Sequence, residues 1–231
     1  TPTPWATFRL ASLAVFLVSL DATIGFAAFP ALSASFSQAS YAEVSWVLTA
    51  YAIVYAALLV PAGRLADLLG RKRLFLIGVA LFSVASGLCG LATELSWLIG
   101  CRVLQAVGAA LLTPTSLALI LDAFPAEKRT VVVGLWGAVG ALAAALGPSV
   151  GALIIQASSW HWVFLLNVPV GLLAWLRARK GLVESSNPSR GGLLDIPGIV
   201  VLIAAVALLV LGVTQMNVWA APYSQATVVA G

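Results

Sequence analysis

Charged side chains are scarce in this sequence. Only 9% of its 231 residues are Asp, Glu, Lys or Arg, whereas 61% are hydrophobic. Soluble globular chains carry about 25% charged residues and about 45–50% apolar residues. A polar shell cannot be built from this composition, which excludes a water-soluble globular domain and makes a domain count from chain length inapplicable. We expect a lipid bilayer to replace the shell.

Metal-ligating and nucleophilic residue types are equally scarce. The chain has one histidine, His161, and two cysteines, Cys89 and Cys101, which lie in apolar runs without a CxxC spacing. Cysteines in such runs behave as small buried hydrophobes, and a lone histidine does not make a metal site. The sequence also lacks a nucleophile and base constellation and a Gly-rich phosphate loop. It therefore predicts no metal, no cofactor and no enzymatic activity.

Long apolar runs make up most of the chain. A helix needs about 20 mostly apolar residues to cross about 30 Å of hydrocarbon. Seven segments qualify: residues 9–30, 44–63, 74–92, 97–121, 130–155, 162–177 and 194–214. Because most connections are short, consecutive helices should be antiparallel neighbours. The predicted fold is an all-α integral membrane bundle of six helices with one additional transmembrane helix.

The polar residues divide the chain into three parts. We predict a six-helix bundle over residues 1–180, a cytoplasmic linker over 181–195, and a seventh transmembrane helix with an outer loop over 196–231. An eighth apolar run begins near Ser224 and is too short to span a bilayer. Both ends of the sequence therefore look like cuts, with the carboxy-terminal cut inside an eighth helix.

Basic residues predict the orientation, because cytoplasmic loops collect positive charge. With the amino terminus inside, eleven of the twelve Lys and Arg residues are cytoplasmic: Arg9, Arg64, Arg71, Lys72, Arg73, Lys128, Arg129, Arg177, Arg179, Lys180 and Arg190. This distribution predicts a multi-pass plasma-membrane protein with a cytoplasmic amino terminus. It also accounts for the net charge of +4 without a nucleic-acid partner.

Two charged residues lie within predicted spans. Asp21 is about 18 Å and Arg102 about 22 Å from the inner boundary, at 1.5 Å per helical residue. Charges at such depth face a cavity or a partner. Burial favours the neutral acid and an approaching arginine favours the carboxylate, so Asp21 and Arg102 could couple to proton movement. The alternative is a structural ion pair that locks two helices together.

Polar and small residues follow Arg102 along one face of the fourth span. Their spacing of three or four residues is that of one helix face: Gln105, Ala109, Thr113 and Ser116. We interpret Gln105, Thr113 and Ser116 as the lining of a cavity. Hydrogen bonding between helices is the alternative, since Ser and Thr commonly serve that purpose in membranes.

Small residues recur at spacings of three and four in the fifth span: Gly137, Gly140, Ala144, Gly147 and Gly151. Such a stripe allows another backbone to approach closely, and packing alone explains it. Pro148 removes one backbone hydrogen bond, so we expect a bend at this position.

The connection between the second and third spans contains Gly63, Asp67, Gly70, Arg71 and Lys72. A membrane anchor with a turn would explain its basic residues but not its aspartate. A carboxylate here can cap a helix or pair with arginine. It could therefore form a latch that two conformations make and break.

These residues resemble the signatures of the major facilitator superfamily, and within it the fourteen-span drug:proton antiporters. The connection matches at Leu65 as well as at the five residues above, and the fourth span at Leu98, Arg102, Gln105, Gly108, Ala109 and Ala110. The fifth span resembles the antiporter signature at Gly147, Pro148 and Gly151. Leu20, Asp21, Thr23, Ala28 and Pro30, together with residues 160–171, resemble the fourteen-span branch. The departures are Leu68, Ala106, Ala143, Ala152, Phe26 and His161.

The resemblance implies alternating access by two six-helix bundles around a central cavity, with this chain as the amino-terminal half. It implies that Asp67 helps hold the second bundle, that Arg102 takes part in proton coupling, and that the bent fifth helix favours export. The expected partners are protons, small lipophilic and often cationic substrates, the lipid bilayer and the carboxy-terminal bundle.

Two alternatives stay open. The first is an importer or metabolite exporter of the same superfamily, although the signature at Gly147 and Pro148 argues against import. The second is a membrane fragment or interaction protein that does not transport.

Overall fold

The computed structural model of the protein describes residues 3–186 and 197–212. Every regular element in these residues is an α-helix. In chain order they are α1 (Pro4–Ser35), α2 (Tyr41–Leu69), α3 (Arg71–Gly90), α4 (Leu95–Ala123), α5 (Ala126–Ala157), α6 (His161–Leu165) and α7 (Asn167–Gly181). A shorter apolar helix, Pro197–Gly212, follows.

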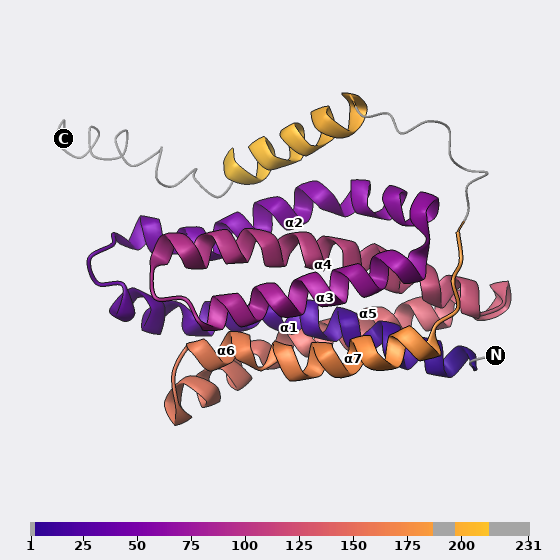
Figure 1. Cartoon of the computed structure of the whole chain (residues 1–231), viewed down its shortest axis with the longest axis horizontal. Helices are drawn as coiled ribbons and strands as arrows, with labels where there is room; N and C mark the ends of the chain where they lie inside the picture. Colours follow the sequence, from indigo (N-terminus) through magenta and orange to yellow (C-terminus); the bar gives the residue numbers. More distant parts are fainter. Residues whose placement is uncertain (1–2, 187–196, 213–231) are drawn as a thin grey trace, which may run out of the picture.

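Six helices are long and apolar enough to cross a membrane, counting α6 and α7 as one span. They lie side by side, and their connections alternate between the two ends of the bundle (Figure 1). The start of α1, the α2 to α3 turn, the α4 to α5 turn and the end of α7 share one end, at which the basic residues are predicted to gather. The predicted all-α multi-pass fold is confirmed, and the orientation stays a prediction.

The helices extend beyond the predicted spans because polar groups cap them. The hydroxyl of Thr3 accepts a hydrogen bond from the backbone N–H of Ala6, so α1 begins at Pro4 rather than at residue 9. Ser40 and Glu43 form a reciprocal capping box that begins α2. Such caps satisfy the free N–H groups of a first helical turn.

The sixth predicted span, residues 162–177, is divided in the structure. The helix α6 ends at Leu165 and α7 begins at Asn167. Pro169 explains the division, because it has no N–H for the carbonyl of Leu165, four residues earlier. The predicted seventh span is described only over Pro197–Gly212. Most of the predicted linker, and the eighth run, lie outside the described residues.

Close contacts between α3 and α4 depend on glycine. A Cβ atom added to Gly108 would lie 2.6 Å from the backbone nitrogen of Phe82, and one added to Gly78 would lie 3.1 Å from the Cβ of Leu111. Lipid gives apolar helices little hydrophobic reason to associate, so close backbone packing must supply the attraction.

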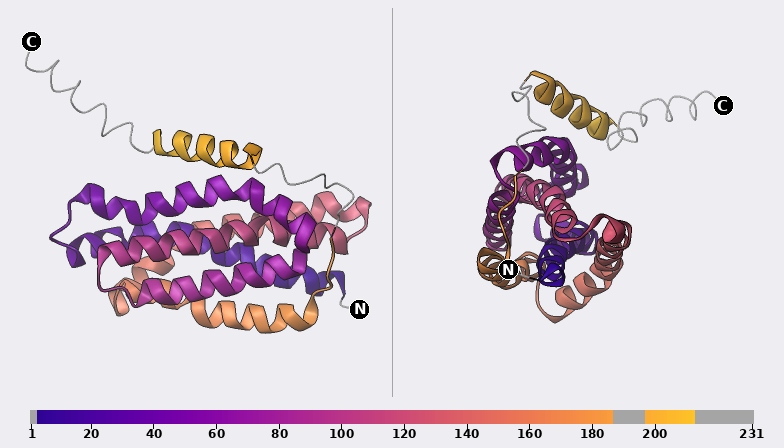
Figure 2. Two further views of the ribbon diagram at one scale, coloured as in Figure 1. Left: turned by 45° about the horizontal axis from the view of Figure 1, so that its top comes forward. Right: turned by 90° about the vertical axis from the view of Figure 1, so that its right-hand side faces the viewer.

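The glycine stripe of α5 packs against α1, which runs through the interior of the bundle with α5 along one side (Figure 2). A Cβ atom at Gly147 would lie 2.9 Å from the Cβ of Thr23 and 3.0 Å from the backbone nitrogen of Ile24. Gly137, by contrast, has no atom within 4 Å of such a Cβ. α5 is continuous through Pro148, and the expected bend at this residue stays a prediction.

We predict that Gly147→Ala lowers the melting temperature of the detergent-solubilised chain, because α1 backbone must move to admit the methyl group. Overpacking of this kind costs about 1–3 kcal/mol. Gly137→Ala, on the same helix, is the control and should be neutral or stabilising. Unfolding can be followed by the reaction of buried Cys89 with a fluorogenic thiol reagent. Equal melting temperatures for the two variants would contradict close α1 to α5 packing.

Candidate functional site

Asp21 and Arg102 meet in the interior of the bundle. Asp21 comes from the middle of α1 and Arg102 from the second turn of α4, and each is only 1% exposed. A terminal nitrogen of Arg102 donates to the Oδ2 atom of Asp21 at 2.6 Å. Asp21 and Arg102, which the sequence predicted to lie at a similar depth in the membrane, are therefore in direct contact.

Three further polar side chains complete this site, which we call the buried polar cluster: Asp21, Ser86, Arg102, Gln105 and Asn167. The amide nitrogens of Gln105 and Asn167 each donate to the Oδ1 atom of Asp21 at 2.9 Å. Both amides also donate to the hydroxyl of Ser86, at 3.0 and 2.9 Å. The cluster thus joins α1, α3, α4 and α7 through one carboxylate and one hydroxyl.

Arg102 also fastens α4 to α2. Its Nε donates to the backbone carbonyl of Val47 at 3.2 Å, and a terminal nitrogen donates to the Oε1 atom of Gln105 at 2.7 Å. The ring of Tyr51 lies 4.0 Å from the guanidinium carbon, in cation–π contact. Arg102 is therefore held by contacts from α1, α2 and its own helix.

The remaining residues of the polar face of α4 have other neighbours. Gln105 and Ser116 are fully buried, so neither lines an open surface of the described bundle. Ser116 accepts a hydrogen bond from the indole N–H of Trp136 on α5 at 3.2 Å. Thr113 is half-buried and lies 3.1 Å from the hydroxyl of Tyr55 on α2. These contacts fit the interhelical hydrogen bonding that the sequence left as an alternative. A cavity role for Gln105, Thr113 and Ser116 stays a prediction.

A second polar site lies where α2 turns into α3. Arg71 donates to the Oδ1 atom of Asp67 at 3.0 and 2.7 Å and forms an ion pair with Asp122 at the end of α4. Gly70 makes the turn with a φ of +105°, which side chains rarely adopt. Gly63 lies against α4, where its Cβ would be 3.4 Å from the Cβ of Pro114.

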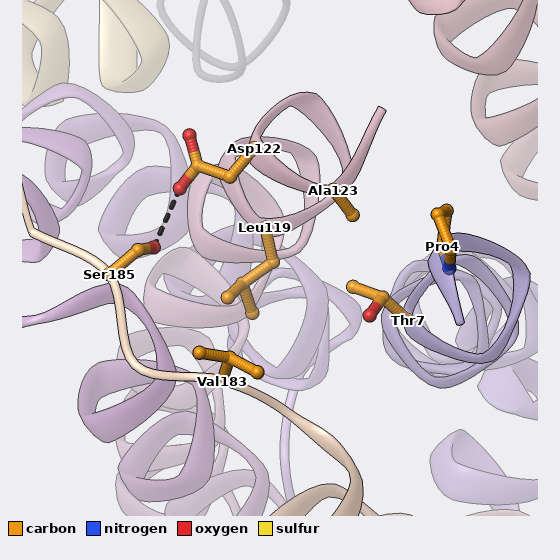
Figure 3. A pocket seen from close by; sticks show the side chains of 7 residues that line it. All are labelled: Pro4, Thr7, Leu119, Asp122, Ala123, Val183 and Ser185. Atoms are coloured by element: carbon orange, nitrogen blue, oxygen red, sulfur yellow. Dashed lines mark hydrogen bonds between the residues drawn. The ribbon is translucent and has the colours of Figure 1, made fainter. Parts of the chain in front are cut away.

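The chain that leaves α7 is tied to this turn. The carboxylate of Glu184 accepts from the backbone N–H groups of Lys72 and Arg73 at 3.0 and 3.1 Å, so it caps the start of α3. The Nζ of Lys72 donates to the carbonyl of Leu182 at 2.7 Å. Ser185 donates to Asp122 at 2.6 Å, beside a cavity of about 260 Å³ that residues of α1 and α4 also line (Figure 3).

A profile described as Major Facilitator Superfamily matches residues 11–229. The chain belongs to the Major Facilitator Superfamily. Within the described residues no group of three or more His, Cys, Asp or Glu side chains is placed to hold a metal ion.

Relatives within the superfamily include export proteins. The tetracenomycin C resistance and export protein of Streptomyces glaucescens is 36% identical over 94% of this chain and 40% of its own length. The probable multidrug resistance protein EmrY of Escherichia coli is 37% identical over 89% of this chain and 41% of its own length. These matches confirm the predicted relationship to the fourteen-span drug efflux branch. The chain spans less than half of each relative.

Solved structures confirm the superfamily fold. A peptide transporter POT, crystallised with sulfate, superposes with a TM-score of 0.65 at 16% identity, over 92% of this chain and 46% of its own. A bacterial homologue of the human lysosomal transporter Spinster gives a TM-score of 0.61 at 21% identity, over 85% of this chain and 47% of its own. At these identities the likeness establishes the fold alone.

Several contacts of this superfamily member were not predicted from its sequence. Asn167 and Ser86 were not assigned a role, although polar side chains within apolar runs were the available signal. Asp122 and Glu184 were also missed, because each meets the α2 to α3 turn from a segment far away in the chain.

We predict that Asp21→Asn and Arg102→Gln each lower the stability of the chain by about 3–5 kcal/mol, because each leaves an uncompensated buried group. The double variant should lose much less than the sum, since it removes both charges together. Thermal unfolding in detergent measures all three variants, and Thr113→Val is a control outside the ion pair. Additive losses would show that Asp21 and Arg102 do not stabilise each other.

Proposed function

We propose that this chain is the amino-terminal half of a transporter that exports small hydrophobic, often cationic, compounds in exchange for protons. One observation carries the proposal: a titratable carboxylate, Asp21, is paired with Arg102 at 1% exposure inside two membrane-spanning helices. Ionisable residues within spans are costly and typically mark substrate or proton pathways. Relatives named for drug resistance and export favour this function over import.

Proton binding at Asp21 would change which helices the buried polar cluster holds together. The carboxylate accepts hydrogen bonds from Arg102, Gln105 and Asn167. A protonated carboxyl carries a donor and no charge, so it loses its attraction for the guanidinium and one of its acceptor positions. Arg102 would keep its bonds to Gln105 and Val47 on the α4 and α2 side. The proton would thus loosen α1 from α4.

The stripe on α5 would transmit this change. Gly147 and Gly151 contact Thr23, Ile24 and Ala27, the turns of α1 that follow Asp21. A shift of α1 on protonation therefore acts directly on α5. We assign Gly147, Pro148 and Gly151 to this coupling and, by the resemblance to antiporters, to export.

We predict that Asp21→Asn in the full-length transporter abolishes pH-driven efflux, because asparagine has the shape of aspartate but cannot exchange a proton. Efflux of a cationic dye from inside-out vesicles, with and without a pH gradient, measures the effect, normalised to folded protein. Asp21→Glu keeps a titratable group and should retain part of the activity. An unchanged pH dependence in Asp21→Asn would assign the residue a purely structural role.

Asp67, Arg71 and Asp122 are proposed as a conformational latch. Arg71 bridges α2 and α4 at the predicted cytoplasmic end. Gly70 makes the turn, Lys72 ties it to Leu182, and Gly63 packs α2 against α4. Arg71 is largely buried, at 14% side-chain exposure, whereas Asp67 retains 28%, so the aspartate can also meet a second bundle. Opening the transporter to this side would require these bonds to separate.

We predict that Asp67→Asn reduces efflux by the full-length transporter severalfold without reducing membrane insertion, since the basic residues that direct insertion are kept. Glu127→Gln removes an exposed carboxylate at the same end and serves as the control. Dye efflux and the amount of protein in the membrane are measured together. The same efflux in both variants would favour a plain membrane anchor.

Export of a polar metabolite is the second candidate. The riboflavin transporter RibZ of Clostridioides difficile is 32% identical over 91% of this chain and 46% of its own length. Efflux assays with riboflavin and with cationic dyes in parallel distinguish the two substrate classes. Transport of neither, by the full-length protein, would favour a membrane protein that does not transport.

A further inference from the structure

A hollow of about 680 Å³ lies between the first turns of α1 and the last turns of α7. Leu10, Leu173 and Leu176 contribute apolar surface to it. Gly181 allows α7 to approach α1, because a Cβ atom added to it would lie only 3.0 Å from the Cδ1 atom of Leu10. Leu173 and Leu176 are about half exposed, at 48% and 49%. The hollow is therefore open at the surface of the described bundle.

Three cations border this hollow and no acid does. Arg9, Arg177 and Lys180 line it and are exposed. Among the residues that the structure describes, no acidic side chain forms an ion pair with Arg9, Arg177 or Lys180. The neighbouring Arg179 lies elsewhere, with its guanidinium carbon 5.5 Å from the ring of Trp175.

The spacing of charge and apolar surface matches a phospholipid. From Leu173 to Lys180 the helix rises about 10 Å. A rise of about 10 Å corresponds to the distance from the acyl chains to the phosphate layer of a membrane. Lysine and arginine side chains are long enough to reach this layer from a helix. Inner leaflets contain anionic lipids, and basic pockets between spans on the cytoplasmic side bind their headgroups.

We propose that the hollow between α1 and α7 is a binding site for one anionic phospholipid of the cytoplasmic leaflet. The phosphodiester contacts Arg9, Arg177 and Lys180, and an acyl chain lies along Leu10, Leu173 and Leu176. The site is distinct from the buried polar cluster and from the latch, and it does not depend on the transported substrate.

Binding of dioleoylphosphatidylglycerol to the delipidated 231-residue chain, measured by native mass spectrometry in detergent, tests the site. We expect this lipid to bind on the order of tenfold more tightly than dioleoylphosphatidylcholine, because each cation contributes to the attraction of an anionic headgroup. The variant Arg9→Gln/Arg177→Gln/Lys180→Gln should lose this preference. The control Arg73→Gln/Lys128→Gln/Arg179→Gln removes the same charge from the same end and should keep it.

A second variant tests the apolar half of the site without changing its charge. Leu176→Trp fills the hollow and should also weaken binding of the anionic lipid, and thermal unfolding verifies that each variant is folded. Equal loss in the control triple variant, equal affinity for the zwitterionic lipid, or full competition by soluble glycerol 3-phosphate would each overturn the proposal. Equal loss in the control variant would show that binding depends only on the net charge of this end. Equal affinity for the zwitterionic lipid would show that the groove does not select the headgroup. Competition by glycerol 3-phosphate would show that the site binds small anions.

Discussion

The carboxylate of Asp21 is the group around which this bundle is organised. A bilayer offers no water to a buried polar group, so each one must find its partners within the protein. Asp21 obtains them from α4 and α7 at 2.6 to 2.9 Å, and Ser86 of α3 completes the set. Asn167 is the first residue of α7, so its contacts with the cluster lie next to the division between α6 and α7. Four helices are thereby fixed in rotation as well as in distance.

Such short polar contacts require helices that approach closely, and small residues make this possible. Gly108 packs against the backbone of Phe82, and Gly147 against Thr23 and Ile24. Larger side chains at these positions would separate α3 from α4 and α1 from α5. The buried charge and the glycines are therefore two parts of one constraint: an ion pair away from water is favourable only when its geometry is tight and its remaining hydrogen-bonding groups are satisfied.

Hydropathy and depth were sufficient to predict the six spans, the shared level of Asp21 and Arg102 and the packing role of the glycines. They could not predict how each helix is rotated about its own axis, and this rotation decides which side chains of other helices each residue contacts. Periodicity put Gln105, Thr113 and Ser116 on one face, but that face meets Asp21, Tyr55 and Trp136 from three different helices. Glu184 is a similar case, since its partners lie more than 100 positions earlier in the chain.

The distribution of polar contacts indicates which helices would move together. α2 and α4 are linked directly at two levels, Val47 with Arg102 and Tyr55 with Thr113. At a third level Arg71, the first residue of α3, joins Asp67 of α2 to Asp122 of α4. Within the described part of the chain no side-chain hydrogen bond joins α1 to α5, which meet through small and apolar residues. Apolar surfaces can slide without leaving a polar group unsatisfied, whereas the links of α2 to α4 cannot separate without that cost. We therefore infer that α2 and α4 move as one unit, and that any change in the charge of Asp21 is expressed mainly as a shift of α1 relative to that unit.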